Sequence, residues 1–415
     1  MKIVIFEDSQ FSNLLPLAYF RPVWELRCGI QLLGEKIQKM FPKQPLGYSA
    51  RQYLMDYYLP PAECFYPSSM QEEILFINGR ILSNSSLKGN LKEISAKTAF
   101  VNDDNTLIAW RVEKQNVASY FEQGVLQSER VLNDFPSSRI SAEFIQYPWD
   151  LIDRNGDQIH QDAIQLKKLG QHSGRIDKGC HILGPKNIYL GKGSRIMPGT
   201  VLDAESGPIW IGQKTTVLPN AVLRGPLAIG NDSLIKIGAK LYQNTSIGPV
   251  CKVGGEVEGS IIQGFSNKQH DGFLGHAYLG AWINIGADTN NSDLKNNYGK
   301  ISVYLNNRTI ETEKRFLGLM MGDHTKTAIN TMFNTGTVVG VNCNIYGEGF
   351  PPKFIPSFSW GGSGGIREYQ FEKALEVARV VMERRNVPFT EKYLKLFQAV
   401  KELTLKIENR ARINE

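Results

Sequence analysis

The sequence lacks the features that would place a protein in a membrane or outside the cell. No apolar run approaches the ~18 residues that a bilayer-spanning helix needs. The opening stretch MKIVIFE is followed at once by Asp8, which excludes a signal peptide. The five cysteines are odd in number, scattered and without a CxxC or Cys/His spacing, so they indicate neither a disulfide framework nor a zinc site. We therefore expect a cytoplasmic protein with no membrane partner.

The chain also lacks blocks of like charge. Its net charge of +6 comes from 47 Lys and Arg against 41 Asp and Glu, spread along the sequence. No basic run of the kind that binds nucleic acid is present, so we expect no nucleic-acid partner. The excess charge favours small anionic ligands such as phosphates or coenzyme A. A merely basic surface explains it equally well.

At 415 residues the chain is too long for one ordinary core. We predict an α/β domain over residues 1–155, a linker over 156–180, a repetitive domain over 181–350 and a C-terminal segment over 351–415. That segment begins with SFSWGGSGG, which we interpret as a flexible glycine stretch, and continues with two amphipathic helices.

The repetitive domain has a period of six residues. A parallel β-helix of triangular section needs one large aliphatic side chain per face pointing into a narrow core, with small residues and glycines near the corners. No α-helix has this period, so the pattern predicts an all-β left-handed parallel β-helix, with an irregular β-sandwich as the alternative. The repeating aliphatic positions are Ile211, Val217, Leu223, Ile229, Ile235, Leu241, Ile247 and Val253.

After a disturbance near residues 257–268, we expect the inward positions to resume at Phe273, Leu279 and Ile285. A later run begins at Met321 and continues to Ile345. Between these runs, KISVYLNNRTIETEKRF predicts a hairpin insertion over residues 300–316. A loop that leaves the β-helix can cover a site on its side.

Histidine is the first candidate for a base that works near neutral pH, and the chain has six. By the six-residue phase, His270 and His276 each lie three positions before an inward residue, so both should face outward. His324 lies three positions after Met321 and should also lie outside. Each histidine alone fits a surface or hydrogen-bonded role as well as a catalytic one.

The run NKQHDGFLGHAYLGAWINIGADTNNSD resembles the acetyltransferase half of the bifunctional N-acetylglucosamine-1-phosphate uridyltransferase/glucosamine-1-phosphate acetyltransferase family. Without a gap, the resemblance puts His270 on the catalytic base and Phe273 on a tyrosine. It puts Asn284 on a ligand-binding asparagine and Ala287 near the acetyl thioester. His276 falls where relatives usually carry aspartate, so we prefer His270 as the base, with the choice between the two left open.

The resemblance implies transfer of an acetyl group from acetyl-CoA to an amino-sugar phosphate. Phe273 lacks the hydroxyl of the family, and Asp293 stands where the bacterial enzyme has asparagine, so the acceptor can differ from glucosamine-1-phosphate. The basic residues that the resemblance suggests are Lys314, Arg315 and Lys326 for the coenzyme phosphates, and Arg224 and Lys268 for phosphate or sugar. Each also fits a plain surface charge.

The N-terminal pattern MKIVIF, GIQLLGEKIQKMF, ILFIN is a β-α-β unit suited to a doubly wound, Rossmann-like sheet. FIQYPWDLI resembles the closing segment of nucleotidyltransferase domains. The glycine-rich GxGTRM loop that cradles nucleotide phosphates in that class is missing, and EDSQFSNLLPLAYFRPVWELRCG stands in its place. The chain is similar to a divergent sugar nucleotidyltransferase subfamily with RPxxELRxG.

In this subfamily the phosphate contacts need another source. Arg21 and Arg27 could bind phosphates through their guanidinium groups. Asn78 stands where the family has a metal-binding aspartate. Function and structural pairing are equally good interpretations of these three residues. Asp103, Asp104 and Asp150 remain as weak candidates for Mg²⁺ ligands.

Three hypotheses follow. The first is a bifunctional enzyme that acetylates a sugar phosphate and activates one with a nucleoside triphosphate. The second keeps the acyltransferase and treats the N-terminal domain as a nucleotide-sugar binding or regulatory module. The third is a non-catalytic trimeric scaffold. Because a β-helix exposes broad flat faces, we expect a homotrimer in the enzyme cases as well.

Overall fold

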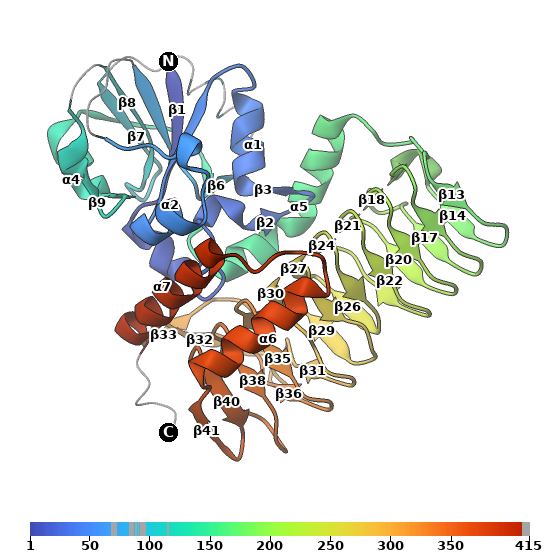
Figure 1. Ribbon diagram of the computed structural model, residues 1–415. Coiled ribbons are helices and arrows are strands. Elements are labelled where there is room, and N and C mark those ends of the chain that lie inside the picture. The colour runs from blue at the N-terminus through green and yellow to red at the C-terminus, as the bar shows by residue number, and fades with distance from the viewer. Residues whose placement is uncertain are drawn as a thin grey trace.

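The computed structural model describes residues 1–67, 73–82, 87, 89, 91, 97–113 and 116–408. An N-terminal α/β domain lies against one side of a long β-helix, and two C-terminal helices lie across the β-helix beside it (Figure 1). Helix α5 (Pro148–Leu166) connects the two parts. The predicted fold class is confirmed.

The N-terminal domain is built on a six-stranded mixed sheet in the order β11-β7-β8-β5-β1-β4. β1 pairs in parallel with both β4 and β5, whereas β8 runs antiparallel to its two neighbours. The chain therefore leaves β1 toward one side of the sheet and returns on its other side. The strands are β1 (Lys2–Phe6), β4 (Leu46–Ser49), β5 (Ile74–Asn78), β7 (Thr98–Val101), β8 (Leu107–Val112) and β11 (Ser137–Arg139).

Short elements complete this domain. They are the 3-10 helices η1 (Ser9–Leu14), η2 (Val23–Glu25), η3 (Pro61–Glu63) and η4 (Ala118–Tyr120), the helices α1 (Leu33–Met40), α2 (Gln52–Tyr57) and α4 (Ser128–Asp134), and the strands β2 (Arg27–Cys28), β3 (Gln31–Leu32), β6 (Ile81–Leu82), β9 (Phe121–Glu122), β10 (Val125–Leu126) and β12 (Glu143–Phe144).

The β-helix has three faces, each a stack of parallel strands from successive coils. Face 1 comprises β15 (Ile188–Leu190), β18 (Ile209–Ile211), β21 (Leu227–Ile229), β24 (Thr245–Ile247), β27 (Ile261–Gly264), β30 (Tyr278–Ala281), β34 (Met320–Met321), β37 (Val338–Val339) and β39 (Phe354–Ile355). The 3-10 helix η5 (Pro185–Asn187) precedes its first strand.

Face 2 comprises β13 (Arg175–Ile176), β16 (Arg195–Ile196), β19 (Thr216–Val217), β22 (Leu234–Ile235), β25 (Lys252–Val253) and β28 (Asn267–Lys268), and continues after a break with β35 (Lys326–Thr327), β38 (Asn344–Ile345), β40 (Ser359–Gly362) and β41 (Gly365–Glu368). Face 3 comprises β14 (His181–Leu183), β17 (Val201–Asp203), β20 (Val222–Arg224), β23 (Lys240–Leu241), β26 (Glu256–Glu258) and β29 (Phe273–Gly275), followed by the pair β31 (Asn290–Asn291) and β36 (Met332–Phe333).

The six-residue phase is confirmed, because all eight aliphatic side chains from Ile211 to Val253 are buried in one core. One later position is wrong. Leu274, not Phe273, enters the core, and it pairs in register with Val257. The coils Leu241 to Val257 and Val257 to Leu274 span 16 and 17 residues, whereas the earlier coil Leu223 to Leu241 spans 18, so the six-residue phase is not kept through this region.

The three faces differ in what covers them. Face 1 is buried where α5 and the N-terminal domain lie on it, and the strands β21, β24 and β27 have no exposed residue. The segment RPVWELR takes part in this contact, because the backbone amide of Arg27 donates to the Gln263 side chain at 3.1 Å and to the Tyr278 hydroxyl at 2.8 Å. Face 3 has outward side chains that are exposed or half-exposed in β14, β17, β20 and β26.

Two boundaries and the glycine stretch differ from the prediction. The expected end of the first domain at residue 155 falls inside α5, and the first β-helix strand already begins at Arg175. The glycine stretch forms an ordered antiparallel hairpin, β40–β41, because its backbone groups pair with each other and with β38. The two helices that follow, α6 (Phe371–Glu383) and α7 (Glu391–Ile407), are as expected.

The predicted insertion is a hairpin of β32 (Ser302–Leu305) and β33 (Arg308–Glu311). It packs on the β-helix as well as on the N-terminal domain, because β32 contacts β37 of face 1 and the Tyr304 ring lies 5.0 Å from the Phe354 ring of β39. Its apolar side chains Ile301, Val303 and Leu305 join the core that contains the N-terminal domain. In Figure 1 the hairpin lies beside α7, between the β-helix and the N-terminal domain.

Candidate functional site

The predicted acyl-transfer residues lie along two different edges of face 3. His270 lies at the corner between faces 2 and 3, in the turn after β28. Ala287 lies at the same corner on the next coil, where the neighbouring Asp288 amide donates to the Asp271 carbonyl at 3.0 Å. The His270 imidazole is exposed and makes no hydrogen bond to a described residue. This corner is the His270 edge.

Lys268 lies beneath the His270 edge in an unusual place. It occupies the inward position that Val253 holds on the preceding coil, and it is 2% exposed. Its Nζ donates to the His270 carbonyl at 2.7 Å. Burial lowers the pKa of Lys268 to about 8. The side chain therefore fixes the backbone of the turn and does not face an open site.

His276 lies at the opposite edge of face 3, between faces 3 and 1. Its Nδ1 is 2.7 Å from Oδ2 of Asp293 on the next coil. The Phe316 ring lies 5.2 Å from the imidazole. Gly259 lies beneath the His276 imidazole, since a Cβ at Gly259 would be 3.0 Å from the imidazole ring. Gly275 makes room in the same way for Phe273 and Asp293, each of which would lie 2.4 Å from an added Cβ. This corner is the His276 edge.

A carboxylate on Nδ1 fixes the tautomer and orientation of an imidazole and leaves Nε2 as the nitrogen that can accept a proton. The His276 side chain is 28% exposed and the Asp293 side chain 14%, so the pair is partly shielded and still reachable. The sequence signal for this pair is the seventeen-residue separation of one coil, which becomes readable only once the coil lengths are known.

Asn284 and Lys326 line a third region, a cavity of about 400 Å³ between face 2 and α6. Lys326 Nζ donates to the carbonyls of His324 at 2.6 Å and Trp282 at 3.4 Å. Burial lowers the pKa of Lys326 to about 7. No carboxylate is among the described lining residues, which are Lys252, Phe265, Asn267, Gln269, Trp282, Ile283, Asn284, Lys326, Val377, Val381, Arg384 and Arg385. We name this cavity the basic pocket.

His324 does not lie outside, so that prediction is wrong. It is 3% exposed, and its Nε2 lies 2.7 Å from the Tyr393 hydroxyl of α7. Burial lowers the pKa of His324 well below its ordinary value, and the positive charges of Lys326 and Arg21 lower it further. The phase correctly placed it off the β-helix core, but α7 and the N-terminal domain cover that corner.

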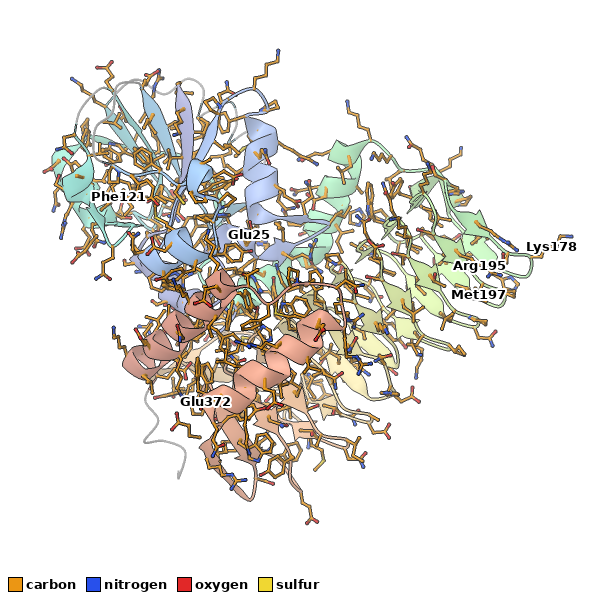
Figure 2. The ribbon with its side chains drawn as sticks, viewed as in Figure 1. Glu25, Phe121, Lys178, Arg195, Met197 and Glu372 are labelled. Carbon is orange, nitrogen blue, oxygen red and sulfur yellow. The ribbon has the colours of Figure 1, made fainter. Side chains whose placement is uncertain are left out.

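The other predicted basic residues do not gather at one site. Arg224 approaches Asp203 at 3.6 Å on face 3, three coils before His276, which is about 14 Å along the axis. Lys314 forms an ion pair with Asp153 of α5, and Arg315 is exposed. Figure 2 shows Lys178, Arg195 and Met197 at the far tip of the β-helix, remote from the N-terminal domain.

The N-terminal domain has its own cavity, of about 600 Å³, beyond the carboxyl ends of β1 and β5. These strands flank the point where the chain direction across the sheet reverses, which is where doubly wound sheets bind ligands. Asp8 and Arg80 lie there, with Oδ2 and Nη2 2.6 Å apart. The Asn78 amide donates to the same carboxylate at 2.8 Å. We name this cavity the crevice.

Arg21 and Arg27 do not line the crevice. Arg21 forms a buried ion pair with Asp323 of the β-helix, with Nη1 also 3.1 Å from Oδ1. Arg27 lies at the same junction, where Figure 2 labels Glu25, whose carbonyl accepts a hydrogen bond from Gln263 at 2.6 Å. The RPVWELR segment thus joins the two domains. The arginines that do line the crevice, Arg80, Arg130 and Arg308, carried no motif in the sequence.

The three aspartates do not form a metal site. Asp103 and Asp104 are exposed in the turn between β7 and β8. Asp150 accepts the amides of Gln146 and Tyr147 at 2.8 and 2.9 Å, which is the capping role of an acidic residue in the first turn of α5. Burial raises its pKa. Within the described ranges, no group of three His, Cys, Asp or Glu side chains could hold a metal ion.

Parts of the chain are similar to known proteins. Residues 3–169 match the family model described as sugar nucleotidyl transferase. The "Bifunctional protein GlmU" of Rippkaea orientalis is 29% identical over 205 residues, or 48% of this chain, and that of Methanocaldococcus jannaschii is 24% identical over 303 residues, or 66% of this chain. Over part of its length the chain is thus similar to proteins named bifunctional GlmU.

The coverage of these relatives is partial. The match spans 38% of the Rippkaea protein and 71% of the Methanocaldococcus protein. A "Bifunctional sugar-1-phosphate nucleotidylyltransferase/acetyltransferase" of Sulfurisphaera tokodaii is 25% identical over 199 residues, covering 48% of this chain and 43% of that protein. Among solved structures, a UDP-N-acetylglucosamine acyltransferase from Bacteroides fragilis gives a TM-score of 0.25 at 14% identity, covering 56% of this chain and 96% of that one.

Among the residues that the structure describes, no helix has the length and apolarity needed to cross a membrane.

Proposed function

We propose that the β-helix transfers an acyl group, in its specific form an acetyl group from acetyl-CoA, to the amino group of a sugar phosphate. The observation that carries this proposal is the His276–Asp293 pair at 2.7 Å on the edge of an uncovered β-helix face. The relationship to proteins named as acetyltransferases supports it. We place the protein in the cytoplasm, where acetyl-CoA is available.

In this proposal His276 is the general base. The acceptor nitrogen attacks the thioester carbonyl carbon, and its proton passes to Nε2 while Asp293 holds the ring through Nδ1. The carbon–sulfur bond then breaks, and the thiolate leaves with the proton returned from the imidazolium. We thus favour His276 over the sequence-based choice, His270, whose imidazole has no orienting partner among the described residues.

The His270 edge contributes from a neighbouring chain. In a C₃ assembly with a heterologous interface, one edge of face 3 lies beside the opposite edge of the next subunit. His270 and Ala287 of one chain would then face His276 and Asp293 of its neighbour. A backbone amide near Ala287 can donate to the developing oxyanion, and His270 can contact the acceptor phosphate. The proposal therefore requires a homotrimer.

The basic pocket suits the phosphates of the coenzyme. Its walls carry the cationic side chains of Lys252, Arg384 and Arg385, beside a Lys326 whose pKa burial lowers to about 7, and no carboxylate among the described residues. Asn284 lies in this pocket, and Ala287 follows three residues later along the coil, roughly 10 Å away. A bound coenzyme that starts in the pocket can thus bring its thioester to the His270 edge.

The N-terminal domain is proposed to transfer a nucleotidyl group from a nucleoside triphosphate to a sugar-1-phosphate in the crevice. The family match over residues 3–169 supports this activity. The described residues do not fit a protein-held Mg²⁺ ion, so we assign no step to one. The missing GxGTRM loop supports a second candidate for this domain, a nucleotide-sugar binding or regulatory module.

Two assays test the proposals. Thiol release from acetyl-CoA with a panel of amino-sugar phosphates should be lost in His276→Ala. Retained turnover in that variant would contradict the assignment of the base, and no turnover on any amino sugar would favour a scaffold. Pyrophosphate release from UTP or dTTP with sugar-1-phosphates tests the crevice, and binding without turnover would favour the binding module.

A further inference from the structure

The hairpin insertion belongs to both candidate sites. Its stem leaves the β-helix at the His276 edge, where Asp293 and Phe316 lie and where Leu294 bridges to Phe316. Its tip lies against the N-terminal domain. A single insertion of the β-helix therefore connects the acyl-transfer edge to the crevice.

The tip is held in place by polar contacts on both sides. Asn306 donates to the Asn13 side chain at 3.0 Å, and Asn307 donates to the Ile407 carbonyl at 2.7 Å. Nearer the stem, Lys314 pairs with Asp153 of α5. Together with the buried apolar side chains of β32, these contacts fix the hairpin against the N-terminal domain.

Arg308 follows these asparagines directly and lines the crevice. Its Nη2 donates to the Tyr147 hydroxyl at 3.4 Å, which is a weak contact. The guanidinium is exposed and forms no ion pair with a described residue. The hairpin thus holds the Arg308 backbone beside the crevice, and its guanidinium has no carboxylate partner among the described residues.

The crevice needs such a cation. The stretch after β1 forms the helix η1 and offers no glycine loop to bind phosphates through backbone amides. Of the arginines in the crevice, Arg80 already gives Nη2 to Asp8 and Nη1 to the Ile145 carbonyl. Its Nε is buried without a hydrogen-bond partner among the described residues. Arg308 can supply two parallel donors to a phosphate group, which a single buried Nε cannot.

We propose that Arg308, contributed by the β-helix, completes the nucleotide site of the N-terminal domain by binding a phosphate group of a nucleoside triphosphate. This inference rests on the proposed nucleotidyl transfer in the crevice. It makes the crevice a composite site, because its phosphate contact comes from the domain that carries the acyl-transfer edge.

The test is binding of UTP, dTTP and inorganic pyrophosphate to the full chain by calorimetry. Arg308→Ala should weaken binding of the nucleotide that the wild type prefers by about 10- to 150-fold, the range for one charge-assisted contact. Lys300→Ala is the matched control, because Lys300 is a basic residue of the same hairpin whose side chain pairs with Glu313. It should bind like the wild type.

Two further measurements separate a ligand contact from a structural role. Arg308→Ala should keep the melting temperature of the free protein, since the side chain is exposed, and added guanidinium ion should partly restore its nucleotide binding. Arg308→Ala that binds as tightly as the wild type would overturn the inference and leave the crevice as the site. A wild type that binds none of the three probes would instead overturn nucleotidyl transfer itself.

Discussion

Replacing Asp293 by asparagine tests the proposed base without removing it. The carboxylate accepts from the His276 ring at 2.7 Å, and the bond is charge-assisted once the imidazole takes a proton. Such a bond is worth about 1.5–3 kcal/mol. Because the imidazolium forms only during the reaction, most of this loss should fall on kcat, which should decrease by about 10- to 150-fold with little change in KM.

The assay is initial-rate thiol release from acetyl-CoA at saturating amino-sugar phosphate. His276→Ala should lose about 10² to 10⁴ in kcat, the range for a general base. Asp232→Asn is the control, because Asp232 is an exposed carboxylate in a turn of an earlier coil. If Asp293→Asn keeps the wild-type kcat while His276→Ala is inactive, the orienting role fails. If both keep it, the base is another residue.

Three further outcomes follow from the packing. Arg21→Ala should lower the free energy of unfolding, measured by denaturant titration, by about 3–5 kcal/mol, because it leaves the buried Asp323 carboxylate unpaired. An unchanged free energy of unfolding would contradict the buried ion pair between the two domains. Burial lowers the pKa of Lys326 from 10.5 to about 7, so between pH 7 and 10.5 the folded protein binds fewer protons than the unfolded chain. The free energy of unfolding should therefore rise with pH in this range, and it should rise less in Lys326→Met. Leu274→Ala should lower the free energy of unfolding by about 2–5 kcal/mol, and Phe273→Ala should lower it clearly less. The reverse order would mean that Phe273, as the six-residue spacing predicted, is the core residue.

The sequence predicted the β-helix well because its signal is local and repeated. All eight repeat positions from Ile211 to Val253 are buried where the six-residue spacing puts them. The phase failed at Phe273, where the coils shorten, because spacing shows which residues share a pattern but not where a coil loses residues. The same shift hid the stacking of His276 on Asp293.

The remaining site features depend on contacts between distant segments. Arg21 was a fair candidate for a phosphate contact, and only the docking of the domains shows that its partner is Asp323. Arg308 gave no signal at all, since a lone arginine in a hairpin turn has the same local pattern whether it faces solvent or a crevice. His324 was placed correctly relative to the core and wrongly relative to solvent, because α7 covers it.

Subunit complementation tests the central claim most directly. Chains carrying His270→Ala are mixed with chains carrying His276→Ala and assayed for thiol release after the assemblies exchange subunits, with the activity of each variant alone as the baseline. If each site joins the His270 edge of one chain to the His276 edge of its neighbour, equal mixing rebuilds about one intact site in four, with about a quarter of the wild-type activity. A mixture that stays inactive, or a protein that sediments as a monomer, would contradict the account.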